Sequence, residues 1–225
     1  MTGILSKSSD RASNHILLPS IRWETYRAIA QDLEAQPSKR LTYDKGFLEI
    51  RMPSDLHKNY KKILGRIVEA LTETLGMEIL SLGSMTCDRE DLAKGLEPDQ
   101  CYYIQNEALV WGKDKIDLQI DPPPDLAIEI DITSSSLNRF AIYAQLGVPE
   151  VWRYDGHIIT IHHLVDDRYV LSDRSIAFPL LRTNDLQNFL ELKSTIKPKL
   201  LPIRSKHNLK QKILDIYMTM AVFRT

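Results

Sequence analysis

The chain has 225 residues, of which 43% are hydrophobic and 26% are charged, and its formal net charge is −1. This length and composition are sufficient for one buried core, and disorder is therefore not the default expectation. The spacing of Cys87 and Cys101 matches no metal or redox motif. The first residues lack the apolar core of a signal peptide, and no apolar run reaches the roughly 18 residues of a membrane helix. We therefore expect a cytoplasmic protein with no membrane partner.

Basic residues are concentrated near the C-terminus. Between Leu192 and Leu214 there are seven lysines and arginines and no acid, so the rest of the chain holds 22 basic and 30 acidic residues. Such a segment indicates either a nucleic-acid contact or a solvated, partly disordered terminus. We divide the chain into a flexible lead (residues 1–19), one domain (20–191) and a basic tail (192–225).

The first third of the chain predicts two helices and a hairpin. Ser20 can cap a helix that runs to about Gln36 and is followed by proline. Residues 40–52 form two strand-like runs around the turn at residues 44–46, which predicts a β-hairpin. Ser54 opens the clearest helix, whose apolar residues recur every three or four positions as far as Gly76. We interpret its apolar stripe as core and its basic residues as a solvated face: Lys58, Lys61, Lys62 and Arg66.

The middle of the chain predicts strands separated by polar connections. A strand is expected over residues 77–82, followed by a polar connection through residues 88–91. Pro98 then stands before a strand of aromatic and β-branched residues that begins at Asp99, since proline is tolerated at the entry to a strand. Residues 105–119 are expected to be a long connection that leads into three consecutive prolines.

Residues 126–132 alternate apolar and acidic side chains, which predicts a strand with one buried face. A helix start is expected at residues 133–136, followed by a helix over 137–146 with Leu137, Phe140, Ala141 and Ala144 buried. Arg139 and Tyr143 are four residues apart and therefore share another helix face. Three strands with two tight turns then predict a β-meander over residues 150–172.

Two acids in this order of elements can form a metal site. Asp99 begins one predicted central strand and Glu129 lies within the next. If the two strands pair, their carboxylates meet on one side of the sheet, and carboxylate oxygens are the ligands that Mg²⁺ or Mn²⁺ prefers. A metal held there could activate a water molecule and stabilise the charge that develops on a phosphodiester.

Three sequence blocks resemble the Uma-type family of endonucleases. They are Glu-Pro-Asp at residues 97–99, Pro-Asp-Leu-Ala-Ile-Glu at 124–129, and Tyr-x-x-x-Gly-Val-Pro-Glu-Val-Trp at 143–152. That family belongs to the restriction-endonuclease-like PD-(D/E)xK superfamily. The resemblance implies an α/β fold (α+β mixed): a central mixed β-sheet flanked by helices, with an N-terminal helix and hairpin and a C-terminal β-meander.

The resemblance also implies site residues. Asp99 and Glu129 correspond to the two metal-binding acids of the motif. The superfamily lysine belongs two positions after the second acid, where this chain has Asp131, which is either a third ligand or a structural acid. Arg139 stands where members of this family place a basic residue on the following helix. Its high pKa suits it to clamping a phosphate and not to acting as a general base.

Two further residues are similar to the family pattern Glu-x-x-x-Pro-x-x-x-His. Glu49 and His57 occupy its ends and are expected to border the substrate cleft. From its position in the first turn of a helix, His57 could instead close a local hydrogen bond.

The sequence therefore supports competing functions. The first is a metal-dependent endonuclease that uses Mg²⁺ or Mn²⁺ to hydrolyse DNA. The alternative is a catalytically inactive nuclease fold that acts as a nucleic-acid-binding or protein-interaction module, and a third reading is a transposon-associated remnant. The resemblance also implies a possible homodimer.

Overall fold

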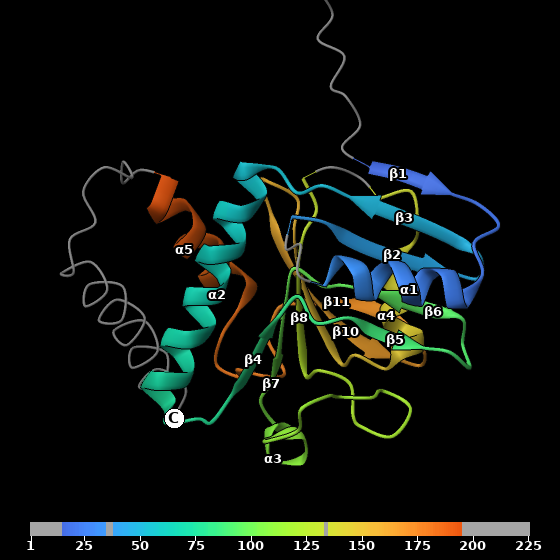
Figure 1. The fold of residues 1–225 in the computed structure, drawn as a ribbon. Coiled ribbons are helices and arrows are strands. Elements are labelled where there is room, and N and C mark those ends of the chain that lie inside the picture. The colour runs from blue at the N-terminus through green and yellow to red at the C-terminus, as the bar shows by residue number, and fades with distance from the viewer. Residues whose placement is uncertain (1–14, 35–37, 133–134, 195–225) are drawn as a thin grey trace, which may run out of the picture.

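The computed structural model describes residues 15–34, 38–132 and 135–194. Most of the predicted lead, half of the predicted helix start at residues 133–136, and nearly all of the basic tail lie outside these ranges. The division of the chain at residues 19 and 191 stays a prediction. Figure 1 shows the described elements, which are, in chain order, β1 (His15–Leu18), α1 (Trp23–Leu33), β2 (Arg40–Asp44), β3 (Phe47–Arg51), α2 (Asp55–Leu75), β4 (Leu80–Gly83), β5 (Cys87–Arg89), β6 (Lys94–Leu96), β7 (Gln100–Tyr103), α3 (Glu107–Val110), β8 (Leu126–Ile130), α4 (Arg139–Leu146), β9 (Glu150–Tyr154), β10 (Ile159–Val165), β11 (Arg168–Ser172) and α5 (Thr183–Ser194).

A six-stranded mixed sheet forms the centre of the molecule, with the strand order β11-β10-β9-β8-β7-β4. Strands β8 and β9 are parallel, whereas the other neighbours in this sheet are antiparallel. Parallel neighbours require a crossover, and α4 supplies it. The predicted mixed α/β architecture is confirmed, and the predicted meander continues the central sheet as β9, β10 and β11.

A second, antiparallel sheet was not predicted. It has the strand order β1-β3-β2-β6-β5, and the predicted hairpin supplies β2 and β3. Lys45 and Gly46 both have positive φ angles at its turn, as a tight two-residue hairpin turn requires. The predicted polar connection at residues 88–91 contains the end of β5 and part of the turn that leads to β6, and neither strand was predicted. These three-residue strands are too short to show a hydrophobic period in the sequence.

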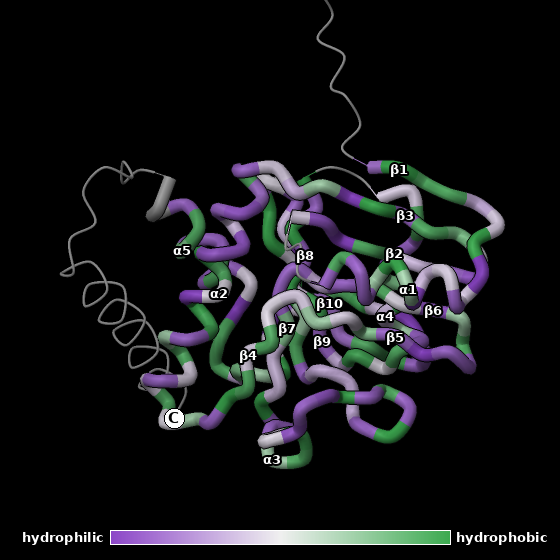
Figure 2. Tube along the Cα trace, in the orientation of Figure 1, coloured by the Kyte–Doolittle hydropathy of each residue, from purple (hydrophilic) through white to green (hydrophobic). Residues whose placement is uncertain are grey.

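Helix α2 covers one face of the six-stranded sheet and confirms the clearest sequence prediction. The Ser54 side chain accepts a hydrogen bond from the His57 amide, and Gly76 ends the helix in the left-handed conformation. Hydrophilic and hydrophobic segments alternate along α2 in Figure 2. Its apolar residues pack in one core with those of β8, β9, β10 and α5. No helix in the described ranges is long and apolar enough to cross a membrane.

Helix α4 lies on the opposite face of the central sheet, against β5 and β6. It begins at Arg139 and is capped by the Asn138 side chain, several residues after the predicted helix start. Ala141, predicted to be buried, is exposed, whereas Arg139 and Tyr143 are buried. The inward face of the helix therefore carries Arg139 and Tyr143 together with the apolar Ile142 and Leu146, and a buried carboxylate on β8 binds the two polar side chains.

We expect the Leu64→Ala substitution to lower the free energy of unfolding by about 2–5 kcal/mol, because Leu64 is fully buried between α2 and the sheet. Leu56→Ala on the same helix is the matched control, since Leu56 is 52% exposed. Its effect should stay within about 0.5 kcal/mol. Urea denaturation would measure both values, and equal losses would contradict the packing described for α2.

Candidate active site

Charged side chains from both sheets meet where the chain passes from β6 to β7. Asp99 lies in this passage and Glu129 lies on β8. Strands β7 and β8 pair, as predicted, with Gln100 opposite Ile128, and the Asp99 amide donates to the Ile128 carbonyl at 3.2 Å. The two acids are therefore on adjacent segments of the same sheet. The basic side chains come from the hairpin β2–β3 and from the first turns of α2 and α4.

Glu129 is the most heavily bonded acid of this cluster. Arg139 donates to its carboxylate from Nε at 3.1 Å and from Nη2 at 2.5 Å, and the Tyr143 hydroxyl donates to Oε1. Arg51 Nη2 lies 3.7 Å from Oε2. All four side chains are at least nine-tenths buried. The predicted spacing of Arg139 and Tyr143 thus places both on one carboxylate.

Arg139 is held by protein groups on several sides. Its Nη2 donates to the Glu97 carbonyl at 2.8 Å, and its Nη1 donates to the Thr42 hydroxyl of β2. Burial alone would lower the pKa of Arg139, but the charge of Glu129 and its hydrogen bonds raise that pKa. Arg139 therefore stays positively charged, which agrees with the prediction that it is no general base. In this arrangement its fork binds Glu129.

Asp99 is fully buried and is bound by His57. The Nε2 atom of His57 lies 2.9 Å from Oδ2, which also accepts the Ile130 amide at 2.7 Å, and Arg40 Nε lies 3.9 Å from Oδ1. Burial would raise the pKa of Asp99, but the hydrogen bond and charge of His57, with the charge of Arg51, lower it. The structure thus brings His57 into the cluster, and its amide also closes the local bond to Ser54.

Glu49 and Asp131 have other partners. Glu49 is fully buried on β3 and accepts hydrogen bonds from the Ser135 hydroxyl at 2.5 Å and the Ser136 amide at 2.6 Å. It therefore anchors the segment that leads into α4. Asp131 follows β8 and binds Arg153 of β9, with Nε at 3.1 Å and Nη2 at 2.6 Å. Of the two alternatives for Asp131, a third metal ligand or a structural acid, this ion pair favours the structural acid.

The two central acids fit a divalent cation by their chemistry. Among the described residues, no three His, Cys, Asp or Glu side chains are placed to hold a metal together, so Asp131 does not complete a three-ligand set. Mg²⁺ commonly uses only one or two carboxylates and keeps several water ligands. Asp99 Oδ1 is buried and has no hydrogen-bond partner, which leaves it able to accept a further ligand. The carboxylate oxygens of Asp99 and Glu129 therefore fit the ligand chemistry of Mg²⁺ or Mn²⁺.

Three basic residues of the cluster were missed in the sequence. Arg40 and Arg51 stand at the open end of the hairpin, directly opposite each other on β2 and β3, and both are buried. Lys61 was assigned to a solvated face, yet burial and the charge of Arg40 lower its pKa. The sequence analysis predicted the hairpin but not its register, and it is the observed register that places these two like charges opposite each other.

The fold and the cluster define a mixed α/β protein with a buried acid pair surrounded by basic side chains. The profile of the Uma2 family, described as "Putative restriction endonuclease", matches residues 23–197. This match spans most of the chain, so the protein belongs to the Uma2 family, and the resemblance seen in the sequence is confirmed. One solved structure, a "putative nuclease belonging to DUF820 from Anabaena variabilis ATCC 29413", is 16% identical, with 69% of this chain and 92% of that chain covered and a TM-score of 0.48. No curated protein matches.

We expect Glu129→Gln to lower the free energy of unfolding by about 3–5 kcal/mol, because the buried guanidinium groups of Arg139 and Arg51 lose their counter-charge. The matched control is Asp131→Asn, whose partner Arg153 has a side chain that is 40% exposed. That change should cost no more than about 1 kcal/mol. Chemical denaturation measures the unfolding free energy of both variants. Equal losses would contradict the expectation that the buried network around Glu129 contributes more to stability than the exposed pair of Asp131 and Arg153.

The Asp99–His57 pair predicts a pH dependence. The pKa of Asp99 is lower in the folded protein than the value of about 3.9 of an unfolded chain, so its stabilising effect is present above about pH 4 and is lost as pH falls through the folded-state pKa. The difference in unfolding free energy between wild type and Asp99→Asn should therefore shrink on acidification. Urea denaturation between about pH 3 and pH 7 measures it. The exposed Asp114→Asn variant should follow wild type throughout, and a pH-independent effect of Asp99→Asn would contradict the expectation.

Proposed function

We propose that this protein is a nuclease that hydrolyses phosphodiester bonds in DNA with the help of Mg²⁺ or Mn²⁺. The observation that carries the proposal is the buried pair of acids, Asp99 and Glu129, on adjacent segments of the central sheet and in contact with arginine and histidine side chains. Membership in a family described as restriction endonucleases supports the same reaction class.

The residues have distinct tasks in this proposal. Asp99 and Glu129 would hold the metal, which would supply positive charge to the scissile phosphate and lower the pKa of a bound water. His57 fixes the carboxylate of Asp99, while Arg139 and Tyr143 fix that of Glu129. The guanidinium groups around the acids stabilise negative charge that develops on phosphate oxygens, and their burial strengthens this effect.

A second candidate function is nucleic-acid binding without cleavage. It is favoured by the bonding of Arg139, whose fork lies on Glu129 and whose remaining donors lie on Thr42 and Glu97. A metal that binds Glu129 must share or replace these cationic contacts. The two candidates differ in one measurable property, since both bind DNA and only the nuclease breaks it.

We expect the purified full chain to cleave plasmid or duplex DNA with Mg²⁺ or Mn²⁺ and to be inactive with EDTA. Asp99→Asn and Glu129→Gln should each reduce cleavage at least about 100-fold, because each removes a charged metal ligand. Asp131→Asn is the control and should cleave like wild type, since Asp131 binds Arg153 outside the acid pair.

Near-UV circular dichroism of each variant establishes that the fold is kept, and Mn²⁺ binding, followed by electron paramagnetic resonance, reports on the acids without a need for turnover. Wild type that is folded and binds DNA, but cuts nothing with either metal, would support the second candidate. Full cleavage by folded Asp99→Asn and Glu129→Gln would refute the assignment of both acids.

A further inference from the structure

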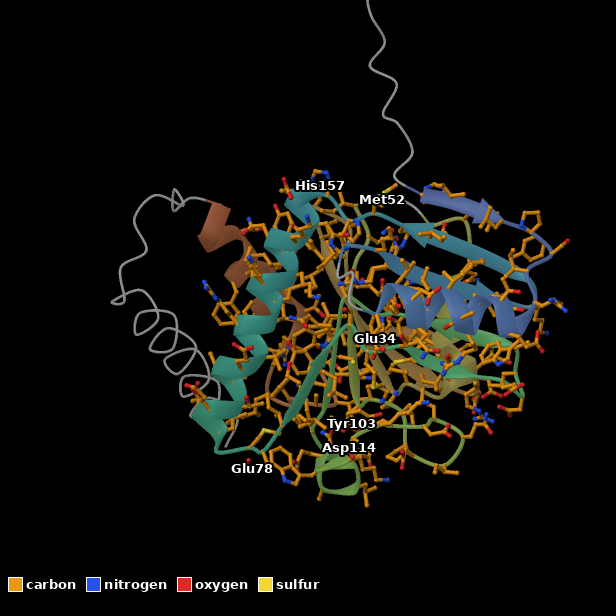
Figure 3. The ribbon with its side chains drawn as sticks, in the orientation of Figure 1. Glu34, Met52, Glu78, Tyr103, Asp114 and His157 are labelled. Atoms are coloured by element: carbon orange, nitrogen blue, oxygen red, sulfur yellow. The ribbon has the colours of Figure 1, made fainter. Side chains whose placement is uncertain are left out.

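Arg51 is a buried arginine with hydrogen-bonding capacity that the protein does not use. It lies at the end of β3, retains 7% of its surface, and its Nε and Nη2 atoms have no hydrogen-bond partner. Figure 3 labels Met52, the next residue, where the chain leads from β3 toward α2. An unsatisfied buried donor costs about 1–3 kcal/mol, so two of them on one charged group call for an explanation.

The two unused atoms form one edge of the guanidinium group. Nε and Nη2 are the same pair of donors that Arg139 presents to Glu129, at 3.1 and 2.5 Å, and that Arg153 presents to Asp131, at 3.1 and 2.6 Å. In Arg51 this edge comes no closer to Glu129 than an ion pair, with Nη2 3.7 Å from Oε2. It is therefore a fork suited to two oxygens of one anion.

The position of Arg51 adds a second reason to expect an anion. Its direct cross-strand partner on β2 is Arg40, which is also buried, and like charges at such positions repel each other. Arg51 Nη2 lies 3.7 Å from the Glu129 carboxylate, which is beyond hydrogen-bond distance. A negative group that binds the free edge of Arg51 would also reduce the repulsion between the two arginines.

We propose that Arg51, with Arg40 beside it, forms the phosphate-binding site of this protein, in which the Nε–Nη2 edge of Arg51 holds two oxygens of one phosphate group. The proposal rests on the proposed function in that the phosphate would belong to the DNA backbone next to Asp99 and Glu129. In this proposal the residue that binds phosphate is Arg51 of the hairpin, whereas the sequence analysis expected that role for Arg139 on α4. Arg139 instead positions Glu129.

The test measures phosphate binding without turnover. The thermal unfolding temperature of the full chain is recorded in inorganic phosphate and in sodium chloride of equal ionic strength. Wild type should be stabilised more by phosphate, and Arg51→Gln should lose this increment through a decrease in phosphate affinity of about tenfold or more. The matched control is Arg153→Gln, which removes a fork already bound to Asp131 and should keep the increment.

A second arm identifies the source of the phosphate. Binding of a short DNA duplex is followed by fluorescence anisotropy in EDTA at fixed salt, and Arg51→Gln should weaken it about tenfold while Arg153→Gln binds like wild type. A third outcome is that wild type gains thermal stability from phosphate and Arg51→Gln loses that gain, while wild type binds no DNA. That result would support the phosphate site and assign it to free phosphate. Should Arg51→Gln not fold, Arg51→Lys keeps the charge without the edge and should retain only part of the increment.

The proposal is overturned if wild type responds equally to phosphate and chloride, or if Arg51→Gln keeps the increment. The latter would mean that Glu129 satisfies Arg51 by itself. These outcomes are separate from those of the cleavage assay. If the protein never cuts DNA but binds phosphate through Arg51, the proposed nuclease is refuted and the phosphate site is retained. If Arg51→Gln cleaves DNA like wild type, the nuclease is retained and the role of Arg51 in binding the DNA phosphate is refuted.

Discussion

The buried ion pair between Glu129 and Arg139 is the interaction on which the rest of the site depends. Arg139 connects β8, where Glu129 lies, to Thr42 on β2 and to the Glu97 carbonyl, so that one guanidinium group joins the two sheets. Removing both charges from water is unfavourable, and only close contact with further hydrogen bonds offsets this cost. The hydroxyl of Tyr143 and the four donors used by Arg139 meet that condition. The pair therefore fixes the inward face of α4 and the position of the second acid together.

The ionisation of each buried acid depends on how close its positively charged neighbours lie. Asp99 has a lowered pKa because His57 outweighs the effect of burial, whereas burial raises the pKa of Glu97 despite the nearby Arg40 and Arg139. A carboxylate that stays ionised when fully buried is suited to a cation, and one with a raised pKa is less suited. This contrast distinguishes Asp99 from Glu97, although both belong to the same Glu-Pro-Asp block. Arg51 differs from Arg139 in having two buried donor atoms without a hydrogen-bond partner.

The elements that the sequence predicted are those with long patterns and defined ends. Helix α2 has both a serine cap and a terminal glycine, the β2–β3 hairpin has a glycine turn, and β8 has a large apolar residue at every second position. The prediction that only one face of this strand is buried was wrong, because all five of its residues are buried. The second sheet was missed because β5 and β6 have three residues each, and three residues do not define a period. The orientation of α4 was missed for another reason. The predicted buried side left out the face formed by Arg139, Ile142, Tyr143 and Leu146, since arginine is rarely buried unless it is paired, and here Glu129 is its partner. Neither the contact between the two sheets nor the burial of Arg51 could be predicted from local sequence.

Asp131 stands where the sequence resemblance led us to expect a lysine. It follows β8 and binds Arg153 of the neighbouring strand, so it serves as the partner of that arginine. Positive charge near the acids comes instead from α4 and from the open end of the hairpin, through Arg139 and Arg51. Guanidinium groups do not lose a proton at any ordinary pH, so these residues act by holding and stabilising negative charge. Their bonding distinguishes the two arginines: each nitrogen of the Arg139 guanidinium group donates to a protein group, whereas the Nε and Nη2 atoms of Arg51 have no hydrogen-bond partner.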